Sequence, residues 1–306
     1  YDEPFADSSQ VPTHLVSRMA REHVTVALSG DGGDELFGGY ERYRMLARMG
    51  RVRHLLPAAL RRPMGRGLLA VPVSGWDGFG QGAAGRILPA ALRHRTGHRV
   101  HKLARVLLAD GSEDLYSLLM SLDNGSDRLV LGAGDRPRAD ASGLRATGIA
   151  AFSPAERGML IDTQTYLPDD LLTKVDRASM AVSLEVRAPF LDPGLYRFAW
   201  GPAADHRIRD GQGKWIVRQL LRRLLPDHLI DRPKVGFGVP ISEWLRGPLR
   251  PWADDLLDPA VIAGQGYLDP GLVARYWRSH CDRTDDFTYQ LWAILMFQAW
   301  LAEAGP

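Results

Sequence analysis

The sequence of 306 residues has few or none of the features that mark several classes of protein. Its single cysteine, Cys281, permits no disulfide within the chain, and this predicts a reducing, cytoplasmic location. Its 38 basic and 36 acidic residues give a formal charge of +2, so no basic excess is available for nucleic-acid binding. The longest apolar stretch, 289–302, is shorter than the ~20 residues of a membrane span and predicts a buried helix. Neither nucleic acid nor membrane is an expected partner.

Lysine is also scarce. The chain contains only Lys102, Lys174, Lys214 and Lys234, and arginine supplies the other basic residues. An ammonium group and a guanidinium group are not interchangeable where one phosphate oxygen must be held. Each of the four lysines is therefore a candidate for a specific role, and chance survival on the surface is the alternative.

The chain starts at Tyr1 without an initiating methionine and without the apolar stretch of a signal peptide. We expect it to be the interior of a longer polypeptide. A helix is expected from Pro12, and residues 24–29, VTVALS, are typical of a strand that is buried on both faces. A glycine-rich turn and a helix near Glu35 follow, which is the α/β arrangement that places a ligand at the carboxyl end of a strand.

Helical patterns dominate after about Arg51. Apolar residues recur at helical spacing in 97–109, 113–122, 155–182, 214–225, 271–280 and 286–304, and Gly/Pro-rich joints are expected at 63–89 and 132–148. One convincing strand cannot make a parallel sheet, so other strands are hidden in the pattern or lie upstream of Tyr1. The predicted fold class is α/β, mostly helical in this stretch, with 1–50 as the end of an α/β part that positions a ligand and 51–306 as a mainly helical part.

The first motif with chemical potential is LSGDGGDELFGGY, residues 28–40. Glycines after a strand let backbone amides approach a phosphate, and Asp31 and Asp34 offer the hard oxygen ligands that Mg²⁺ prefers. The motif therefore suits a magnesium–nucleotide complex, although the chain has no Walker A sequence. An acidic turn or a calcium-binding loop is the alternative.

The second motif, YLPDDLLTKVDRASMAVSLEVRAPFLD, covers residues 166–192. On a helix, the charged ends of Asp170, Lys174 and Arg177 would share one face, which suits either a pyrophosphate clasp or a solvated surface. The third motif, DRPKVGFGVPISEWL at 231–245, places Lys234 in a loop stiffened by Pro233. A lysine there can neutralise an anion, and an ordinary surface loop is the alternative.

Together with DEPFADSSQVPTHLVSRMA from Asp2, these motifs resemble, in the same order, the synthetase domain of the glutamine-dependent asparagine synthase family. The resemblance covers 1–306 as one domain. It implies a Rossmann-like parallel-sheet fold of the ATP-pyrophosphatase superfamily with a large helical C-terminal portion. It also implies a carbon–nitrogen ligase of asparagine biosynthesis that uses ATP and Mg²⁺. In such enzymes a carboxylate, usually aspartate, attacks the α-phosphate of ATP, and ammonia from glutamine then attacks the acyl-adenylate.

The resemblance assigns roles to individual residues. Asp31, Lys234 and Asp170 are implied to be catalytic, Ser29, Gly30, Tyr40 and Lys174 to bind ATP, and Asp34 to bind the metal, with Asp176 as the alternative to Asp170. Lys234 is implied to stabilise charge on the phosphates as pyrophosphate departs.

The sequence departs from the family pattern at three points. The SGGxDS loop and the glutaminase domain are absent from these residues, so we expect a glutaminase domain in cis or in trans and little activity from the isolated chain. Asp31 also stands where asparagine synthetases usually have glutamate, which leaves the acceptor carboxylate open. The alternatives are a tailoring amidotransferase that acts on a natural product or a surface glycan, and a catalytically silent interaction module. A homodimer is compatible with the resemblance.

Overall fold

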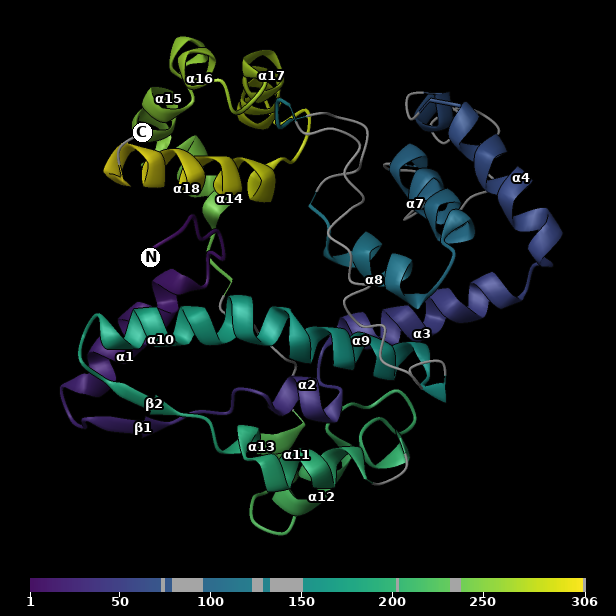
Figure 1. Ribbon diagram of the computed structural model, residues 1–306, viewed down its shortest axis with the longest axis vertical. Helices are drawn as coiled ribbons and strands as arrows, with labels where there is room; N and C mark the ends of the chain where they lie inside the picture. Colours follow the sequence, from purple (N-terminus) through teal and green to yellow (C-terminus); the bar gives the residue numbers. More distant parts are fainter. Residues whose placement is uncertain are drawn as a thin grey trace.

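The computed structural model describes residues 1–72, 75–78, 96–122, 129–132, 151–201, 204–231 and 238–304. Within these ranges the chain is mostly helical, and its one sheet has two strands (Figure 1). The longer helices are α1 (Gln10–Arg21), α3 (Glu41–His54), α4 (Ala58–Ala70), α7 (Thr96–Leu108), α8 (Ser112–Met120), α9 (Pro154–Gln164), α10 (Thr173–Met180), α11 (Pro193–Trp200), α17 (Pro270–Cys281) and α18 (Thr288–Ala304). The shorter ones are α2 (Gly33–Phe37), the π-helix η4 (Leu167–Leu172), the 3₁₀-helices η5 (Pro189–Leu191) and η6 (Ala204–His206), α12 (Trp215–Leu221), α13 (Asp227–Ile230), α14 (Ile241–Arg246), α15 (Arg250–Leu256) and α16 (Pro259–Gln265).

The sheet joins the first two sequence motifs. Strand β1 (Val26–Leu28) pairs in parallel with β2 (Glu185–Arg187), and the Ser29 N–H extends the ladder by donating to the Arg187 carbonyl at 2.8 Å. Because the strands are parallel, their carboxyl ends meet at one edge, where the Gly/Asp turn begins. The α/β element expected there is confirmed.

The expectation that the strand is buried on both faces is wrong for this structure. The side chains of Val26 and Leu28 are 40% and 74% exposed, and β1 follows an exposed-to-intermediate pattern. Among the described residues, β1 has a partner strand on one edge only, and complete burial of a parallel strand requires neighbours on its edges and layers on both faces.

Most of the expected helices are confirmed. Helices α7, α8, α12, α17 and α18 lie where the apolar spacing predicts them, and the single expected segment 155–182 contains α9, η4 and α10 in succession. The predicted joint at 63–89 is wrong in its first residues, because α4 continues through Pro63 to Ala70. Packing against α7 explains this extension, since Gly65 lets the two helices approach closely: a Cβ there would lie 3.0 Å from the Ala104 carbonyl oxygen.

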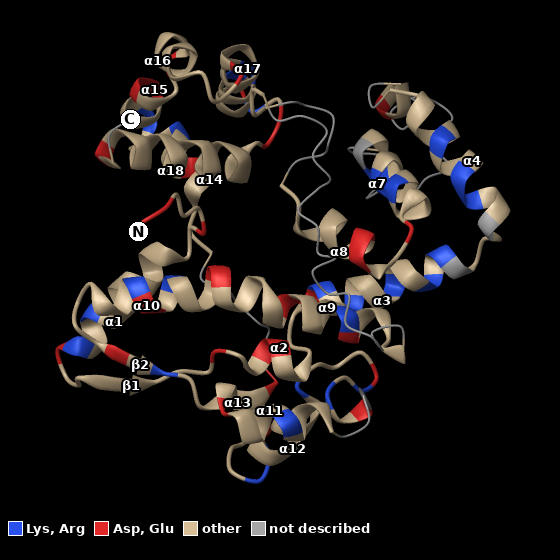
Figure 2. Cartoon of the chain, in the orientation of Figure 1, with Lys and Arg blue, Asp and Glu red and all other residues tan. Residues whose placement is uncertain are grey.

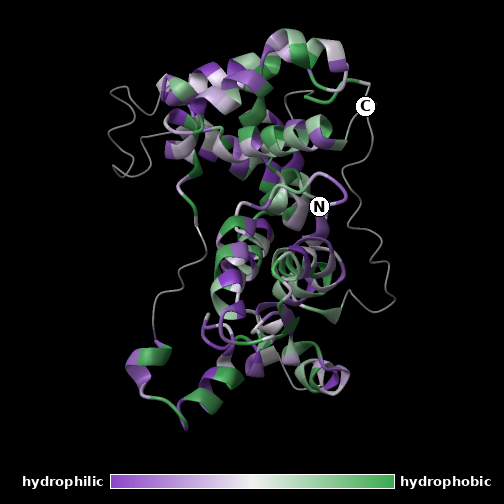
Figure 3. Cartoon of the chain, turned by 90° about the vertical axis from the view of Figure 1, so that its left-hand side faces the viewer, coloured by the Kyte–Doolittle hydropathy of each residue, from purple (hydrophilic) through white to green (hydrophobic). Residues whose placement is uncertain are grey.

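The helices bury separate apolar clusters. One cluster lies among α14–α18 and includes Leu245, Ile262, Val273, Leu291 and Leu295, each fully or almost fully buried. A second lies among α3, α8 and α9 and includes Tyr43, Leu46, Leu115, Met159 and Ile161. Along the helices, hydrophobic residues are interleaved with hydrophilic ones (Figure 3), as expected for helices that bury one face each. In the described part of the chain, no helix combines the length and the hydrophobicity that crossing a bilayer requires.

Candidate active site

The Gly/Asp turn carries the chain from β1 into α2, under the line of α9 and α10 (Figure 1). Gly32 has φ +86°, and a Cβ at this position would collide with Leu191 of η5, so a glycine is needed for this close packing. The hydroxyl oxygen of Ser29 is buried and has no hydrogen-bond partner among the described residues. A buried polar atom without a partner is costly, which makes this hydroxyl available for a polar ligand.

The two aspartates of the turn differ in their surroundings. The Asp34 Oδ1 atom lies 3.1 Å from the Nζ atom of Lys214, whose backbone N–H donates to the Phe37 carbonyl at 2.7 Å. Gly39 packs against both side chains and leaves no space there for a Cβ. Asp34, the predicted metal ligand, is therefore neutralised by a lysine, whereas the Asp31 side chain has no ion pair with any described residue.

Helix α2 also supplies a fully buried carboxyl group. The Tyr40 hydroxyl donates to Glu35 Oε1 at 2.8 Å, and Glu35 is 0% exposed. Burial raises the pKa of Glu35 and also that of Tyr40, because in each case the charged form loses solvation. The predicted site residue Tyr40 is thus held by a neighbour that sequence reasoning did not select.

Two tyrosine rings and an arginine connect the first motif to the second. The Cζ atom of Arg42 lies 4.0 Å from the ring centre of Tyr40 and 4.3 Å from that of Tyr166, and the two rings meet edge to face. The Arg42 Nε atom donates to Asp162 at 2.7 Å. Tyr166 directly precedes η4, so these contacts of Arg42, Tyr40 and Tyr166 hold the Gly/Asp turn beside the second motif.

Asp170 and Lys174 meet Asp7, which comes from the N-terminal segment. Lys174 is 5% exposed, and its Nζ atom donates to Asp7 Oδ2 and lies 3.7 Å from Asp170 Oδ1. Burial, reinforced by the charge of Asp7, raises the pKa of Asp170 to about 6. Burial would also raise the pKa of Asp7, but the hydrogen bonds from Lys174 and Ser9 outweigh it and lower that pKa.

The remaining charged residues of the second motif lie away from this cluster. Arg177 pairs with Asp2 near the surface, and Asp176 is exposed. Lys234 lies outside the described residues. Gly30 is exposed and has open space around its Cα, as an approach to a ligand requires.

Sequence reasoning assigned no role in the site to several residues that the structure places here: Asp7, Glu35, Arg42, Tyr166 and Lys214. Each had a visible signal, since the first four lie in or beside the quoted motifs and Lys214 is one of only four lysines. What the sequence does not reveal is which of them are neighbours.

The residues of the turn suit a metal ion that is bound together with a nucleotide. The described part of the chain holds no group of three or more His, Cys, Asp or Glu side chains placed to bind a metal ion. A magnesium ion that arrives with a nucleotide needs only one or two carboxylates in addition to the phosphates. The turn with Asp31, Asp34 and the unpartnered Ser29 hydroxyl fits such a complex.

Comparisons with known proteins bear on the whole chain. The family model described as asparagine synthase matches residues 1–302. A Mycobacterium tuberculosis protein named provisionally as a glutamine-hydrolysing asparagine synthetase is 36% identical over 98% of this chain and 43% of its own length. Asparagine synthetase (glutamine-hydrolysing) 1 of Bacillus subtilis is 27% identical over 98% of this chain and 44% of its own length.

A more distant match is the amidase chry2 of Gibberella zeae, which is 21% identical over 83% of this chain and 38% of its own length. The chain spans less than half the length of each of these three relatives. With a family model that matches almost every residue, the chain belongs to the asparagine synthase family.

Proposed function

We propose that the chain is the synthetase part of an ATP-dependent amidotransferase that converts a carboxylate, with aspartate as the first candidate, into its amide. The observation that carries this proposal is the meeting of the two motifs: Tyr40, beyond the Gly/Asp turn, contacts Tyr166, which leads into the helix of Asp170 and Lys174. The names of the relatives, which are glutamine-hydrolysing asparagine synthetases, support the same reaction class and ammonia from glutamine.

The turn after β1 would hold the nucleotide. The Ser29 hydroxyl and the open backbone at Gly30 are available to the adenylate and its phosphates, and Asp31 follows them at the mouth of the turn. The substrate carboxylate attacks the α-phosphorus of ATP, the bond to the β-phosphate oxygen breaks, and pyrophosphate leaves. Lys234 would neutralise charge on the departing phosphates, as the resemblance implies.

Magnesium would be held at Asp34, whose carboxylate must then exchange Lys214 for the metal. When bound, the ion would neutralise charge on the phosphates. Asp34 and Lys214 would therefore set how readily the site accepts a magnesium nucleotide.

Asp170 suits the second half of the reaction. Ammonia attacks the carbonyl carbon of the acyl-adenylate, AMP leaves, and the nitrogen must lose a proton. A carboxyl group with a pKa of about 6 is mostly ionised near neutral pH, so it can accept that proton. Lys174 and Asp7 would hold Asp170 in place and set its pKa.

One observation favours a second candidate. The match to a Gibberella zeae protein named an amidase, together with aspartate in place of glutamate at position 31, is compatible with a tailoring amidotransferase that uses the same chemistry on another carboxylate. Substrate profiling separates the two candidates.

The test is exchange of radioactive pyrophosphate into ATP, measured on the full-length protein with aspartate and with a panel of other carboxylates. Aspartate-dependent exchange is expected, together with asparagine formation when glutamine or ammonia is added. Lys234→Ala should abolish exchange in a folded protein, whereas Lys102→Ala, at an exposed lysine of α7, should not. Exchange with none of the carboxylates would contradict the proposal, and exchange with another carboxylate alone would favour the tailoring enzyme.

A further inference from the structure

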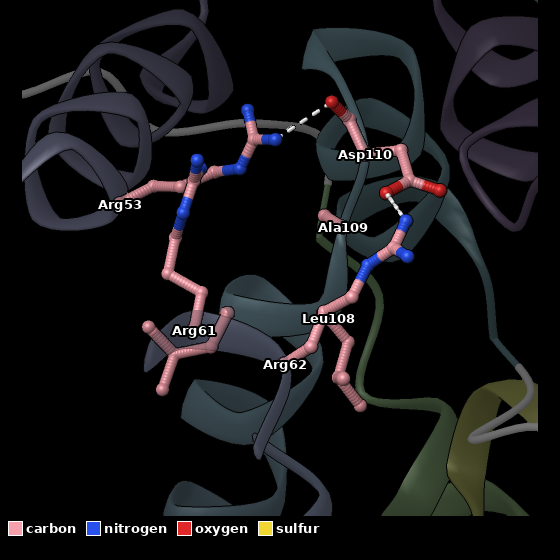
Figure 4. A pocket seen from close by; sticks show the side chains of 7 residues that line it. Arg53, Arg61, Arg62, Leu108, Ala109 and Asp110 are labelled. Carbon is pink, nitrogen blue, oxygen red and sulfur yellow. Dashed lines mark hydrogen bonds and ion pairs between the residues drawn. The ribbon is translucent and has the colours of Figure 1, made fainter. Parts of the chain in front are cut away.

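A separate basic hollow lies at the far end of α3 from the candidate active site. It has a volume of about 310 Å³ and is lined by Arg53 at the end of α3, Arg61 and Arg62 of α4, and Leu107 to Asp110 at the end of α7 (Figure 4). Arg42 and Arg53 are eleven residues apart on α3, which corresponds to roughly 16 Å along the helix. The hollow is therefore distinct from the site around Tyr40.

The three guanidinium groups are only partly neutralised. Arg62 forms an ion pair with Asp110 Oδ1 at 2.9 Å, and Arg53 donates to the backbone carbonyl of Asp110 at 2.7 Å. Asp114 accepts the Asp110 N–H through Oδ2, and its charge acts on Arg53 without a direct ion pair. Arg61 forms no ion pair with any described residue, so two positive charges of the lining lack a paired carboxylate.

Arg53 lies in an unfavourable electrostatic environment. Its Nε atom is buried and lacks a hydrogen-bond partner among the described residues. Burial, and secondly the charge of Arg61, lowers the pKa of Arg53, although arginine stays protonated. A bound anion would offset the repulsion between the two guanidinium groups.

The surrounding helices strengthen the positive field. Glu41, at the start of α3, is the one acidic residue on α3, α4 and α7, whereas arginines and a lysine recur along all three (Figure 2). The basic residues of these helices are Arg42, Arg44, Arg48, Arg51, Arg53, Arg61, Arg62, Arg66, Arg99, Lys102 and Arg105. The whole chain carries a formal charge of only +2, so positive charge is concentrated on this side of the molecule.

We propose that Arg53, Arg61 and Arg62 form a binding site for a phosphate dianion, either free or as the phosphate of a monoester. The excess of positive charge on α3, α4 and α7 favours a dianion over a carboxylate, and the forked guanidinium group is suited to phosphate oxygens. The apolar wall of Leu107 and Leu108 leaves room for a small group attached to the phosphate. This site stands independently of the proposed reaction.

The test is titration of the full-length protein with inorganic phosphate, followed by calorimetry and by the thermal midpoint, with sodium chloride at the same ionic strength as the reference. Phosphate should raise the thermal midpoint above the chloride reference. Arg61→Gln should weaken phosphate binding about tenfold or more, because it removes a charge-assisted donor pair. Arg61→Lys keeps the charge but loses the forked guanidinium group. Its phosphate affinity should lie between those of the unsubstituted protein and Arg61→Gln.

The matched control is Arg66→Gln, which removes the same charge from the same helix but outside the lining, and should change phosphate affinity by less than about twofold. Equal losses in the Arg61 and Arg66 variants would mean a diffuse positive surface and would overturn the site, as would phosphate binding that is unchanged in Arg61→Gln. A second titration with AMP distinguishes a site for free phosphate from a site for a phosphate monoester. AMP binding that depends on Arg61 identifies a monoester site, and phosphate binding alone identifies a site for the free anion.

Discussion

Arg42 packs its guanidinium group against the rings of both Tyr40 and Tyr166 while its Nε atom donates to the buried carboxylate of Asp162. The hydroxyl groups of Tyr43 and Tyr116 donate to the same carboxylate, the latter at 2.6 Å. Helices α3, α8 and α9 are thereby joined at one point, directly behind the residues that line the candidate active site. The position of Tyr40 is therefore tied to the stability of the helical core.

Loss of this guanidinium should destabilise the protein. Arg42→Leu leaves Asp162, which is 0% exposed, with two tyrosine hydroxyls but no positive charge, and we expect a loss of about 3 kcal/mol in the free energy of unfolding. Arg44→Leu breaks the exposed pair with Glu41 and an exposed hydrogen bond to the Gly211 carbonyl, and should cost less than about 1 kcal/mol. Urea denaturation of both variants measures this difference, and equal midpoints would contradict it.

Asp170 should weaken stability while it supports activity. Its folded-state pKa of about 6 lies above its ordinary value of 3.8, so between these values the folded state binds more protons and stability falls as pH rises. Asp170→Asn should therefore stabilise the protein at pH 7 by about 1–2 kcal/mol, after allowance for solvent screening at a side chain that is 34% exposed, and by little near pH 3.

Asp170→Asn should also lose amide synthesis, because the proton acceptor is gone. In the unsubstituted protein, the rate of amide synthesis should rise with pH through about 6, as Asp170 becomes ionised. Asp176→Asn, at an exposed residue of the following helix, is the matched control and should change neither property. A flat pH profile between 5 and 7 would exclude Asp170 from this role.

Lys174 should set the pKa of Asp170. Lys174→Met removes the cation that the two carboxylates share, so the repulsion between Asp7 and Asp170 is no longer offset. The rising limb of the pH–rate profile should move to higher pH by about one unit. A loss of rate without this displacement would indicate a structural role alone. Lys102→Met, at an exposed lysine, should leave the profile unchanged.

Asp34 and Lys214 should have opposite effects on the metal. Asp34→Asn should weaken magnesium-dependent nucleotide binding about tenfold but metal-free binding much less, because a carboxylate ligand is lost. Lys214→Met removes the cation that occupies Asp34 and should strengthen the response to Mg²⁺. Calorimetric titration with and without Mg²⁺ measures both effects. Equal losses for Asp34→Asn under the two conditions would remove Asp34 from the metal site.

Two glycines of α4 provide a matched pair for stability. A Cβ at Gly65 would lie 2.7 Å from Leu108 Cγ and 3.0 Å from the Ala104 carbonyl oxygen, so Gly65→Ala should cost about 1–2 kcal/mol despite its better helix propensity. Gly67 has open space around it, and Gly67→Ala should stabilise α4 by about 0.5–1 kcal/mol. Thermal unfolding of the two variants shows whether each change raises or lowers stability. A stabilised Gly65→Ala would contradict the prediction and show that α7 can shift to make room for the Cβ.

The sequence determined the local structure and the chemistry of the motifs. Apolar spacing located α7, α8, α12, α17 and α18, because one-sided burial of a helix leaves a period of 3.6 residues in the sequence. The strand at 26–28 and the turn after it were likewise predictable, because glycine and β-branched residues have strong local preferences. The motif order also indicated the family.

Tertiary structure decided which charged groups meet. The spacing of Asp170, Lys174 and Arg177 predicted one charged face, but it did not reveal that the buried Lys174 pairs with Asp7 and the exposed Arg177 with Asp2. A buried ammonium needs a carboxylate, and a partner 167 positions away leaves no periodic signal in the sequence.

The exposure of β1 was likewise decided beyond the strand itself. An apolar run indicates that a strand favours burial, but the neighbouring strands and layers determine whether the strand is buried. Local propensity acts over a few residues, whereas burial and charge pairing depend on segments that only the folded chain brings together.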